Sequence, residues 1–507
     1  MTKLDDINQQ DARTEKRSES SGRRTAKKAT VIIVSRAVSK LVAAVSAVIL
    51  ARVLAKEEFG LLQFILTAYL TVSMMSQLGL PESVFYFFER VGPESRKTYA
   101  LLMARVLFLL GAAGSLILIG LTFIAPMWGF EVGWLFLPLV LLCLMDLPCS
   151  LTPNVLVAID RTTQAAWFNL INSSVLFGAT VVPALLGQPL SVIVLCLVGY
   201  GILRFLVSSG FFLRNFRTAG GELPSGIVGS AFSYAVPLAV ANILWTLNRY
   251  VDKYIVAAFL PVAVYAEYSI GAQEIPFVPT IAYSVAMVMM PQLVASYVQG
   301  DRTTLLSLWF QAIRKVSLLI LPVMVLFIVV ADEFIVVAFT EKYANAALPF
   351  RIYTLILFQR VTSYSAVLKA VGQTRAVTNH AIYVVLLNVV LSIPLCMVMG
   401  VAGPPIATVV ASFVTWFYLL VKIKQALEVE FRHVFPFGSY LKTLLVACVA
   451  ALPALFLDRW LHAGPAVALA AKSTTYVASY LTVALATGVC QKTDLKFLAS
   501  LVGVKVR

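Results

Sequence analysis

An apolar stretch near the start of the chain carries two cations at positions where charge is unfavourable. Residues 31–54, VIIVSRAVSKLVAAVSAVILARVL, are long enough to cross a bilayer as a helix. Arg36 and Lys40 lie in its first half, and their i, i+4 spacing places both on one face of the helix. Two cations on one face can hold an anion. Lys40 lies about one turn deeper than Arg36, so anchoring of the helix end is an open alternative for Arg36 more than for Lys40.

Further ionisable residues lie in or near other apolar stretches of the first half. These are Arg105 and Arg204, against a single acid, Asp146. A charge at the centre of a bilayer costs on the order of 3 kcal/mol or more, so such residues are candidates for function by default. Arg36, Lys40, Arg105 and Arg204 are therefore candidates for a binding site. A salt bridge, or extension to the membrane surface, remains an alternative for Arg105 and Arg204.

In the second half the balance shifts towards acids. Glu267 and Glu274 are seven residues apart, close to one helix face, in a stretch interrupted by Pro276. Acids beside a helix break suggest a cation site or a hinge, whereas a solvated position near the interface is the alternative for Glu267. We predict a role in ion coupling or gating for Glu267, Glu274, Asp146 and Arg360.

A second charged group in this half has a simpler explanation. The sequence NRYVDK places Arg249 and Asp252 at i and i+3. Side chains at this spacing are neighbours on a helix surface, so we predict a local ion pair.

Motifs for bond-making chemistry are missing. The three histidines are far apart, and neither HExxH, GxxxxGK[ST] nor GxSxG occurs. Six cysteines without paired spacing suit small core residues better than disulfides or metal ligands. We therefore predict no catalytic residue, no metal and no cofactor.

The elements that carry these residues are predicted to be transmembrane helices. Of 507 residues, 60% are hydrophobic and 13% are charged, with a mean hydropathy of +0.87, more apolar surface than a soluble core could bury. Apolar windows of about 20 residues indicate an all-α polytopic membrane protein with about 14 spans. Their centres are Ala43, Tyr69, Gly111, Leu144, Leu176, Leu197, Ala241, Val278, Val323, Leu357, Val389, Ser412, Ala450 and Tyr480.

The net charge of +15 reflects topology. Most Lys and Arg residues fall in alternate loops, and this asymmetry places both termini in the cytoplasm by the positive-inside rule. Residues 1–30 are polar and of mixed charge, which predicts a disordered cytoplasmic tail rather than a signal peptide. Because topology explains the positive charge, we predict no nucleic-acid partner.

An internal duplication organises the spans. LARVLAKEEFGLLQF, from Leu50, parallels VAAFLPVAVYAEYSI, 206 residues later, and LVAIDRTTQ, from Leu156, parallels LKAVGQTRA, 212 residues later. A separation of six helices puts both copies in the membrane in the same sense, as parallel repeats. We predict six-helix lobes at 31–217 and 227–425, a linker at 218–226, two further helices in 426–492 and a cytoplasmic tail at 493–507.

The order of several short motifs resembles a known family. The motifs are ARVLAKEEFGLLQF, QLGLPESVFYF, NRYVDKYIV, VYAEYSIGAQ, PQLVASYVQGDR, FTEKYANAALPFRIY, VLKAVGQTRAVTN and GVAGPPIATVVAS. Over about residues 30–425 they resemble the bacterial oligosaccharide repeat-unit flippases, a polysaccharide transporter family of the multidrug, oligosaccharidyl-lipid and polysaccharide exporter superfamily. The chain departs from the pattern at Pro404 and Pro405, where alanines are common, and at Thr340, where glycine is common.

The resemblance implies a transporter of the bacterial inner membrane. Its expected substrate is an undecaprenyl-pyrophosphate-linked oligosaccharide repeat unit, moved to the outer leaflet by alternating access of the two lobes for exopolysaccharide, capsule or O-antigen biosynthesis. Membrane lipids, a polysaccharide polymerase and other assembly proteins are expected partners. The resemblance also implies that the protein is not an enzyme. We predict that Arg36 and Lys40, with Arg105 and Arg204 as further candidates, hold the diphosphate. An anion leaving a negative cell interior gains roughly 2.3 kcal/mol per charge per 100 mV.

Other functions stay open at this point. A flippase for the lipid-linked peptidoglycan precursor would bind a chemically similar head group. A cation-coupled multidrug antiporter of the same superfamily would favour acids where this chain has bases. A membrane-embedded glycosyltransferase or ligase would need catalytic residues in a large outer loop, and the predicted outer loops are short.

Overall fold

The predicted spans form long helices joined by short turns. The computed structural model describes residues 31–32, 34–216, 220–273, 275, 278–457 and 463–490, and this part of the chain contains helices and no strand. The predicted tails 1–30 and 493–507 lie outside the described residues. The first helix is Val34–Val53. The others are α2 Lys56–Ser76, α3 Leu80–Phe87, α4 Gly92–Ile124, α5 Leu137–Cys149, α6 Leu151–Ala158, α7 Thr162–Leu185, α8 Leu190–Asn215, α9 Ile227–Phe259, α10 Val262–Gly271, α11 Val278–Val298, α12 Arg302–Val329, α13 Ala331–Phe339, α14 Ala347–Thr354, α15 Tyr364–Ala370, α16 Thr374–Met399, α17 Gly403–Leu427, α18 Phe437–Phe456 and α19 Pro465–Ala486, with short 3-10 turns such as η3 Glu341–Ala346 and η4 Leu355–Phe358.

Within the described residues, 10 helical segments are long and apolar enough to span a membrane. One of them, Thr374–Leu427, contains two predicted spans, which form α16 and α17. The predicted eighth and tenth spans are interrupted, as α10 and α11 and as α14, η4 and α15. The predicted last span forms α19, which contains Lys472 and several hydroxyl side chains. The prediction of an all-α polytopic membrane fold is confirmed.

Helix starts reproduce the predicted duplication. Residues Lys56 of α2 and Val262 of α10 are 206 positions apart, and Thr162 of α7 and Thr374 of α16 are 212 apart. The second span breaks between α2 and α3, and its counterpart, the eighth, breaks between α10 and α11. The breaks themselves do not coincide, because the end of α10 at Gly271 corresponds to Ile65 within α2 at the offset of 206. The two repeats therefore share their helix starts and sequence motifs but not the position of this break.

The break between α2 and α3 depends on Gly79. Its backbone has φ of 66°, a left-handed conformation that suits glycine, and Pro81 follows at the start of α3. A Cβ at this position would lie 3.0 Å from Cβ of Leu238 on α9. Glycine thus permits both the turn and the close approach of α9. Thr340, where the resembling family commonly has glycine, also has a positive φ, 76°, but with ψ of 166° it is not in the left-handed helical region.

The chain forms two compact units. Unit 1 contains residues up to Val53, Ala68–Ile124 and Val132–Ile243, and unit 2 contains Leu54–Thr67, Ala125–Glu131 and the chain from Leu244 onward. Two of the boundaries fall inside helices, one in α2 and one in α9. Each of these helices therefore contributes one part to each unit. The lobe limits 31–217 and 227–425 stay a prediction.

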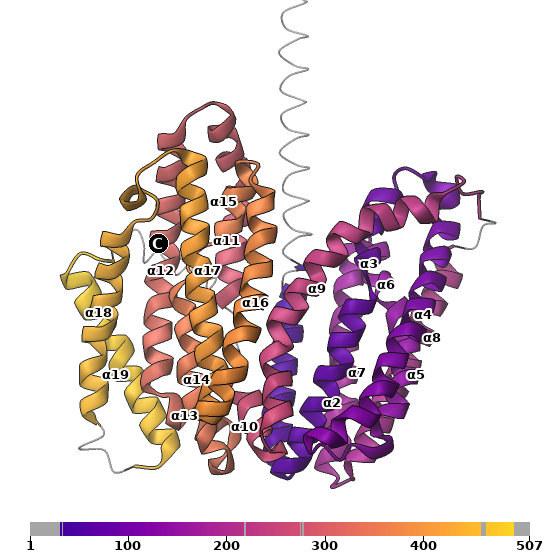
Figure 1. The fold of residues 1–507 in the computed structure, drawn as a ribbon, viewed down its shortest axis with the longest axis horizontal. Coiled ribbons are helices and arrows are strands. Elements are labelled where there is room, and N and C mark those ends of the chain that lie inside the picture. The colour runs from indigo at the N-terminus through magenta and orange to yellow at the C-terminus, as the bar shows by residue number, and fades with distance from the viewer. Residues whose placement is uncertain are drawn as a thin grey trace, which may run out of the picture. The chain divides into compact units, whose positions relative to one another are not determined.

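Unit 1 is a helical bundle around α5 (Figure 1). Helix α5 packs against α4 and α8, while α7 packs against α8 and α6 packs against both α3 and α7. Small residues permit close packing: a Cβ on Gly111 of α4 would lie 3.3 Å from the carbonyl oxygen of Cys143 on α5. This packing brings polar groups of α2, α5 and α8 together inside the bundle.

Unit 2 is a second bundle, in which α16 packs on α17 and α18 packs on α19 (Figure 1). Its core contains aromatic side chains such as Trp309, Tyr364 and Tyr440, all buried. Helix α12 runs through this core and contacts α11 and α18, and α13 contacts α19. The last two helices are therefore integral to unit 2.

Candidate functional site

One intramembrane charge cluster lies inside unit 1. Arg204 of α8 forms an ion pair with Asp146 of α5, and the hydroxyl of Tyr69 on α2 donates a 2.7 Å hydrogen bond to the other carboxylate oxygen of Asp146. Asp146 and Tyr69 are buried, and Arg204 is largely so. The cluster therefore has no net charge, and it joins three helices of the unit.

This pairing separates Arg204 from the other predicted cations. The salt bridge that the sequence left open for Arg204 is present, and its partner is Asp146, the one acid of that group. Arg36 and Lys40 on the helix Val34–Val53 and Arg105 on α4 are exposed. None of the three forms an ion pair with a described residue. Their proposed roles with an anion stay predictions.

In unit 2, Glu267 of α10 is buried and holds a second cluster. Lys56 forms an ion pair with it, and the amide of Asn345 donates a 3.1 Å hydrogen bond to the same carboxylate oxygen. Nearby, the ammonium of Lys342 donates to the carbonyl of Leu54 at 2.7 Å, and partial burial lowers the pKa of Lys342. These contacts attach the start of α2 to α10 and η3 within this unit.

Two other predicted coupling residues are placed differently. Glu274 lies outside the described residues. Arg360 is exposed at the turn between η4 and α15. The structure thus does not bring Arg360 into the Glu267 cluster.

The predicted local ion pair in NRYVDK is wrong. Asp252 of α9 is buried and accepts a 2.6 Å hydrogen bond from the hydroxyl of Tyr268 on α10 and one of 2.9 Å from the backbone N–H of Lys253. The guanidinium of Arg249 lies instead over the ring of Trp245, 5.2 Å from its centroid. The reason is burial: a hydroxyl and an amide satisfy the carboxylate without bringing the exposed arginine inward.

One buried ion pair was missed from the sequence. Lys472 of α19 pairs with Glu333 of α13, and both side chains are largely buried. The signal was present, since Lys472 lies within the last apolar window, eight residues before its predicted centre at Tyr480. No acid within that window pointed to Glu333, which is 139 residues away.

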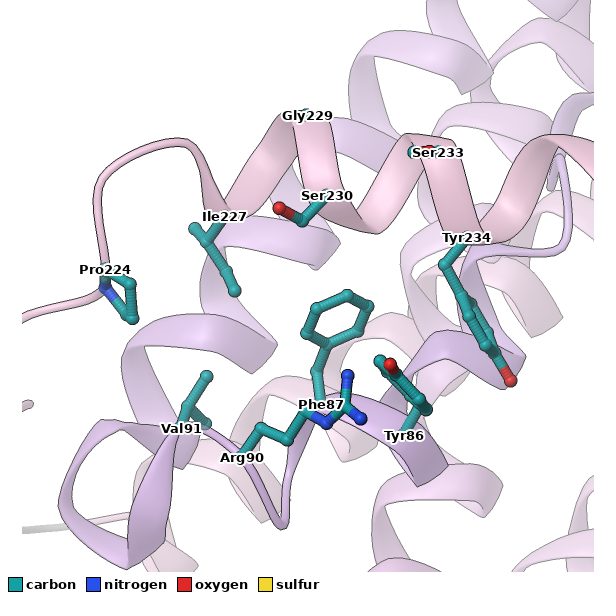
Figure 2. A pocket seen from close by; sticks show the side chains of 10 residues that line it. All are labelled: Tyr86, Phe87, Arg90, Val91, Pro224, Ile227, Gly229, Ser230, Ser233 and Tyr234. Carbon is teal, nitrogen blue, oxygen red and sulfur yellow. The ribbon is translucent and has the colours of Figure 1, made fainter.

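A hollow of about 670 Å³ opens in unit 1 beside α3 and the start of α9 (Figure 2). We call it the aromatic pocket. The side of α3 contributes Tyr86, Phe87, Arg90 and Val91. The side of α9 contributes Pro224, Ile227, Gly229, Ser230, Ser233 and Tyr234. Volumes of about 300–1,000 Å³ are typical of small-ligand sites.

A comparison with family models gives one match. Residues 49–348, more than half of the chain, match the family described as "Polysaccharide biosynthesis protein". The chain belongs to this family. No curated protein sequence matches the chain. The resemblance seen in the motifs is therefore confirmed at the level of the family.

Solved structures share the fold. "Lipid II flippase MurJ, inward closed conformation" superposes with a TM-score of 0.67 at 14% identity, covering 90% of this chain and 98% of that one. An inward-facing multidrug resistance MATE family transporter superposes with a TM-score of 0.58 at 14% identity, covering 77% of this chain and 96% of that one. A transporter of the MOP superfamily from Pyrococcus furiosus superposes with a TM-score of 0.54 at 13% identity, covering 79% of this chain and 95% of that one. This member of the polysaccharide biosynthesis protein family thus has the fold of membrane flippases and exporters, not that of an enzyme.

Proposed function

We propose that the chain is a flippase that moves an undecaprenyl-pyrophosphate-linked oligosaccharide repeat unit across the bacterial inner membrane. The observation that carries this proposal is the family match of residues 49–348 on a chain with the fold of a lipid flippase. The family supplies the connection to polysaccharides, and the fold supplies transport across a membrane. A saccharide that is made inside the cell and polymerised outside it must cross the membrane between these steps.

The charges of unit 1 suit such a substrate. A diphosphate with a sugar head cannot cross hydrocarbon unaided, so it needs a hydrated path with cations. Arg36, Lys40 and Arg105 are exposed and have no described carboxylate partner. We assign the diphosphate to Arg36 and Lys40, which share a helix face, with Arg105 as a further candidate. Arg204 serves mainly to hold the bundle through Asp146.

In the proposed orientation both termini lie in the cytoplasm, because that places most Lys and Arg residues inside. The start of α4 at Gly92 and the start of α12 at Arg302 then face the cytoplasm. Export of the anionic head follows the membrane potential, which supplies roughly 2.3 kcal/mol per charge per 100 mV. Return of the empty carrier is assigned to a proton or sodium ion acting through Glu267 or Glu274. A polysaccharide polymerase and other assembly proteins would receive the product.

Reconstitution tests this proposal directly. Proteoliposomes with the full chain receive undecaprenyl-pyrophosphate-linked oligosaccharide on one leaflet, and a membrane-impermeant glycan-binding protein detects its appearance on the other. Translocation above the rate of protein-free vesicles is expected. If both kinds of vesicle show the same rate under an imposed potential, the proposed activity is wrong.

A second candidate has a specific observation in its favour. The superposition on the lipid II flippase has the highest TM-score of the three comparisons quoted above. Lipid-linked peptidoglycan precursor is therefore the first competitor to add to the same vesicles. The family match predicts that it competes weakly. Strong competition would instead indicate a peptidoglycan precursor flippase. A cation-coupled multidrug antiporter, the third possibility, would move a cationic drug and leave the lipid in place.

A further inference from the structure

We propose that the aromatic pocket of unit 1 binds a saccharide that carries an anionic group. The inference rests on the proposed function and adds a glycan subsite to it. Tyr86 and Phe87 belong to the motif QLGLPESVFYF and the pocket lies within the family match, but neither comparison gives a role to the residues that line it. The pocket lies where the turn after α3 meets the start of α9, and in the proposed orientation this is the cytoplasmic edge of the membrane. A sugar head would reach this place before translocation.

The aromatic rings form a rigid platform. Tyr86 and Tyr234 stack with centroids 4.6 Å apart and an angle of 19° between their planes, and Phe87 stacks on Tyr99 at 5.4 Å. The ring of Phe87 therefore has a fixed support behind it, and Figure 2 shows it projecting into the hollow between α3 and α9. Half-buried Tyr86 and Tyr234 and buried Phe87 give this side of the hollow an apolar surface. The C–H groups of a sugar can cover such a surface, and its burial contributes about 25 cal/mol per Å².

The hydrogen-bonding groups lie around these rings. Ser230 and Ser233 are exposed on α9, three residues apart and so on one side of the helix. Neither hydroxyl has a hydrogen-bond partner among the described residues. Hydroxyls can both donate and accept, which suits the hydroxyl groups of a sugar. An acyl chain in the same hollow would leave these groups and a guanidinium without partners.

Arg90 supplies the charge. Its guanidinium carbon lies 3.7 Å from the centroid of the Tyr86 ring, so the ring supports one face of the planar group while the N–H edges stay available. No described carboxylate pairs with Arg90. By contrast, the guanidinium of Arg96 donates to the carbonyl of Phe88 at 2.9 Å and to the carboxylate of Glu89 at 3.0 Å. Arg90 thus supplies positive charge to the pocket, and the ligand it favours is anionic.

Two sources could supply the anion on the saccharide. One is the carboxylate of an acidic sugar within the repeat unit, and the other is a phosphate on the first sugar. Both offer oxygens to the guanidinium fork in the same way. Of the probes below, one disaccharide carries a carboxylate and another carries a phosphate, and these two distinguish the sources.

The experiment uses the purified full chain in lipid nanodiscs and saturation-transfer NMR with four probes: cellobiose, cellobiouronic acid, cellobiose 1-phosphate and inorganic pyrophosphate. Wild-type protein should transfer saturation to the sugar ring protons of at least one anionic disaccharide and bind it more tightly than cellobiose. Arg90→Gln should weaken that binding about tenfold, the change expected for one charge-assisted hydrogen bond, and should leave cellobiose unchanged. The double variant Ser230→Ala/Ser233→Ala should weaken both disaccharides.

Arg96→Gln is the matched control, because it removes a neighbouring cation that does not line the pocket, and it should bind like wild type. Whichever anionic disaccharide binds identifies the source of the charge. Three results would overturn the proposal: no binding of either anionic disaccharide, equal binding by wild type and Arg90→Gln, or binding of pyrophosphate as tight as that of the disaccharides.

The outcome is separable from that of the proposed function. Wild-type vesicles that translocate the lipid-linked oligosaccharide, together with an Arg90→Gln variant that binds and transports normally, would refute the pocket and leave the flippase standing. Binding of an anionic saccharide by a protein that translocates no lipid would do the reverse.

Discussion

Tyr69 donates a 2.7 Å hydrogen bond to one carboxylate oxygen of Asp146, and Arg204 forms an ion pair with the other. The three residues come from α2, α5 and α8, and they form a neutral unit inside an apolar bundle. A buried pair of this kind is strongly destabilised when one partner is removed, because the other charge then lacks compensation. This makes the cluster a sensitive point for the stability of unit 1.

Asp146→Asn should therefore lower the free energy of unfolding by about 3–5 kcal/mol, since it leaves the guanidinium of Arg204 buried without its anion. Thermal unfolding of the purified protein measures this. The double variant Asp146→Asn/Arg204→Met should recover part of the loss. Glu89→Gln, which breaks an exposed pair with Arg96, is the control and should cost at most about 1 kcal/mol. An Asp146→Asn protein as stable as the Glu89→Gln protein would contradict the assignment.

Glu267→Gln should loosen the start of α2 from the rest of unit 2. Glu267 accepts from both Lys56 and Asn345, and the loss of a charge-assisted hydrogen bond of about 1.5–3 kcal/mol predicts at least tenfold faster amide exchange in residues 54–67. Hydrogen–deuterium exchange measures it. Lys56→Met removes the partner of Glu267 and serves as the comparison. If Glu267 has a purely structural role, the two variants should transport at similar rates. If Glu267 couples an ion, only Glu267→Gln should lose the pH or sodium dependence of transport. Unchanged exchange in Glu267→Gln would contradict the structural contact.

Gly79→Ala should destabilise unit 1 more than Gly92→Ala. Both glycines have positive φ, 66° and 73°, so both substitutions introduce roughly 1–2 kcal/mol of backbone strain. Only at Gly79 would the new methyl group meet a neighbour, Leu238, at 3.0 Å, while nothing lies within 4 Å at Gly92. Gly79→Ala should therefore lower the free energy of unfolding by about 1–3 kcal/mol more than Gly92→Ala, and this difference measures the packing of α9 on the turn. Equal values would show that α9 is not packed there.

Asp301 should titrate well below an ordinary aspartate. Its carboxylate accepts from the N–H of Thr304 at 2.9 Å and from the hydroxyl of Thr303 at 2.7 Å, and these bonds lower its pKa to about 2. Asp301 directly precedes α12, and its side chain caps the N-terminus of this helix. Because the pKa of Asp301 is depressed in the folded protein, this cap stabilises α12 fully above the ordinary pKa of about 4 and loses its effect as the pH falls through about 2. NMR titration of the labelled carboxyl group measures this. An apparent pKa near 4 would mean that the cap is open.

Hydropathy predicted the helices well because a membrane span must satisfy its backbone internally, which leaves a long apolar run as its signal. The duplication was visible because α2 and α10, and α7 and α16, begin at equivalent motifs. Side-chain partners were less predictable. Asp146 and Arg204 are 58 residues apart, and no periodic pattern connects them.

The failure at Asp252 has the same physical origin. Spacing on one helix favoured Arg249, whereas the side-chain hydrogen bond to the buried carboxylate of Asp252 comes from Tyr268 on the next helix, α10. The aromatic pocket could not be predicted for a related reason. Its two sides, at Tyr86 and at Tyr234, are far apart in the chain, and only the packing of α9 against α3 brings them together.

Exposed cations in the first half of the chain are central to the proposed transport, and translocation by Lys40→Ala proteoliposomes tests them most directly. Arg432→Ala, which removes an exposed cation that pairs with Glu430, is the matched control. With equal amounts of folded protein, Lys40→Ala should move the undecaprenyl-pyrophosphate-linked oligosaccharide at least tenfold more slowly than wild type, as expected for loss of one charge-assisted contact to the diphosphate, and Arg432→Ala should match wild type. Equal rates for Lys40→Ala and wild type would contradict the assignment of the diphosphate to this helix.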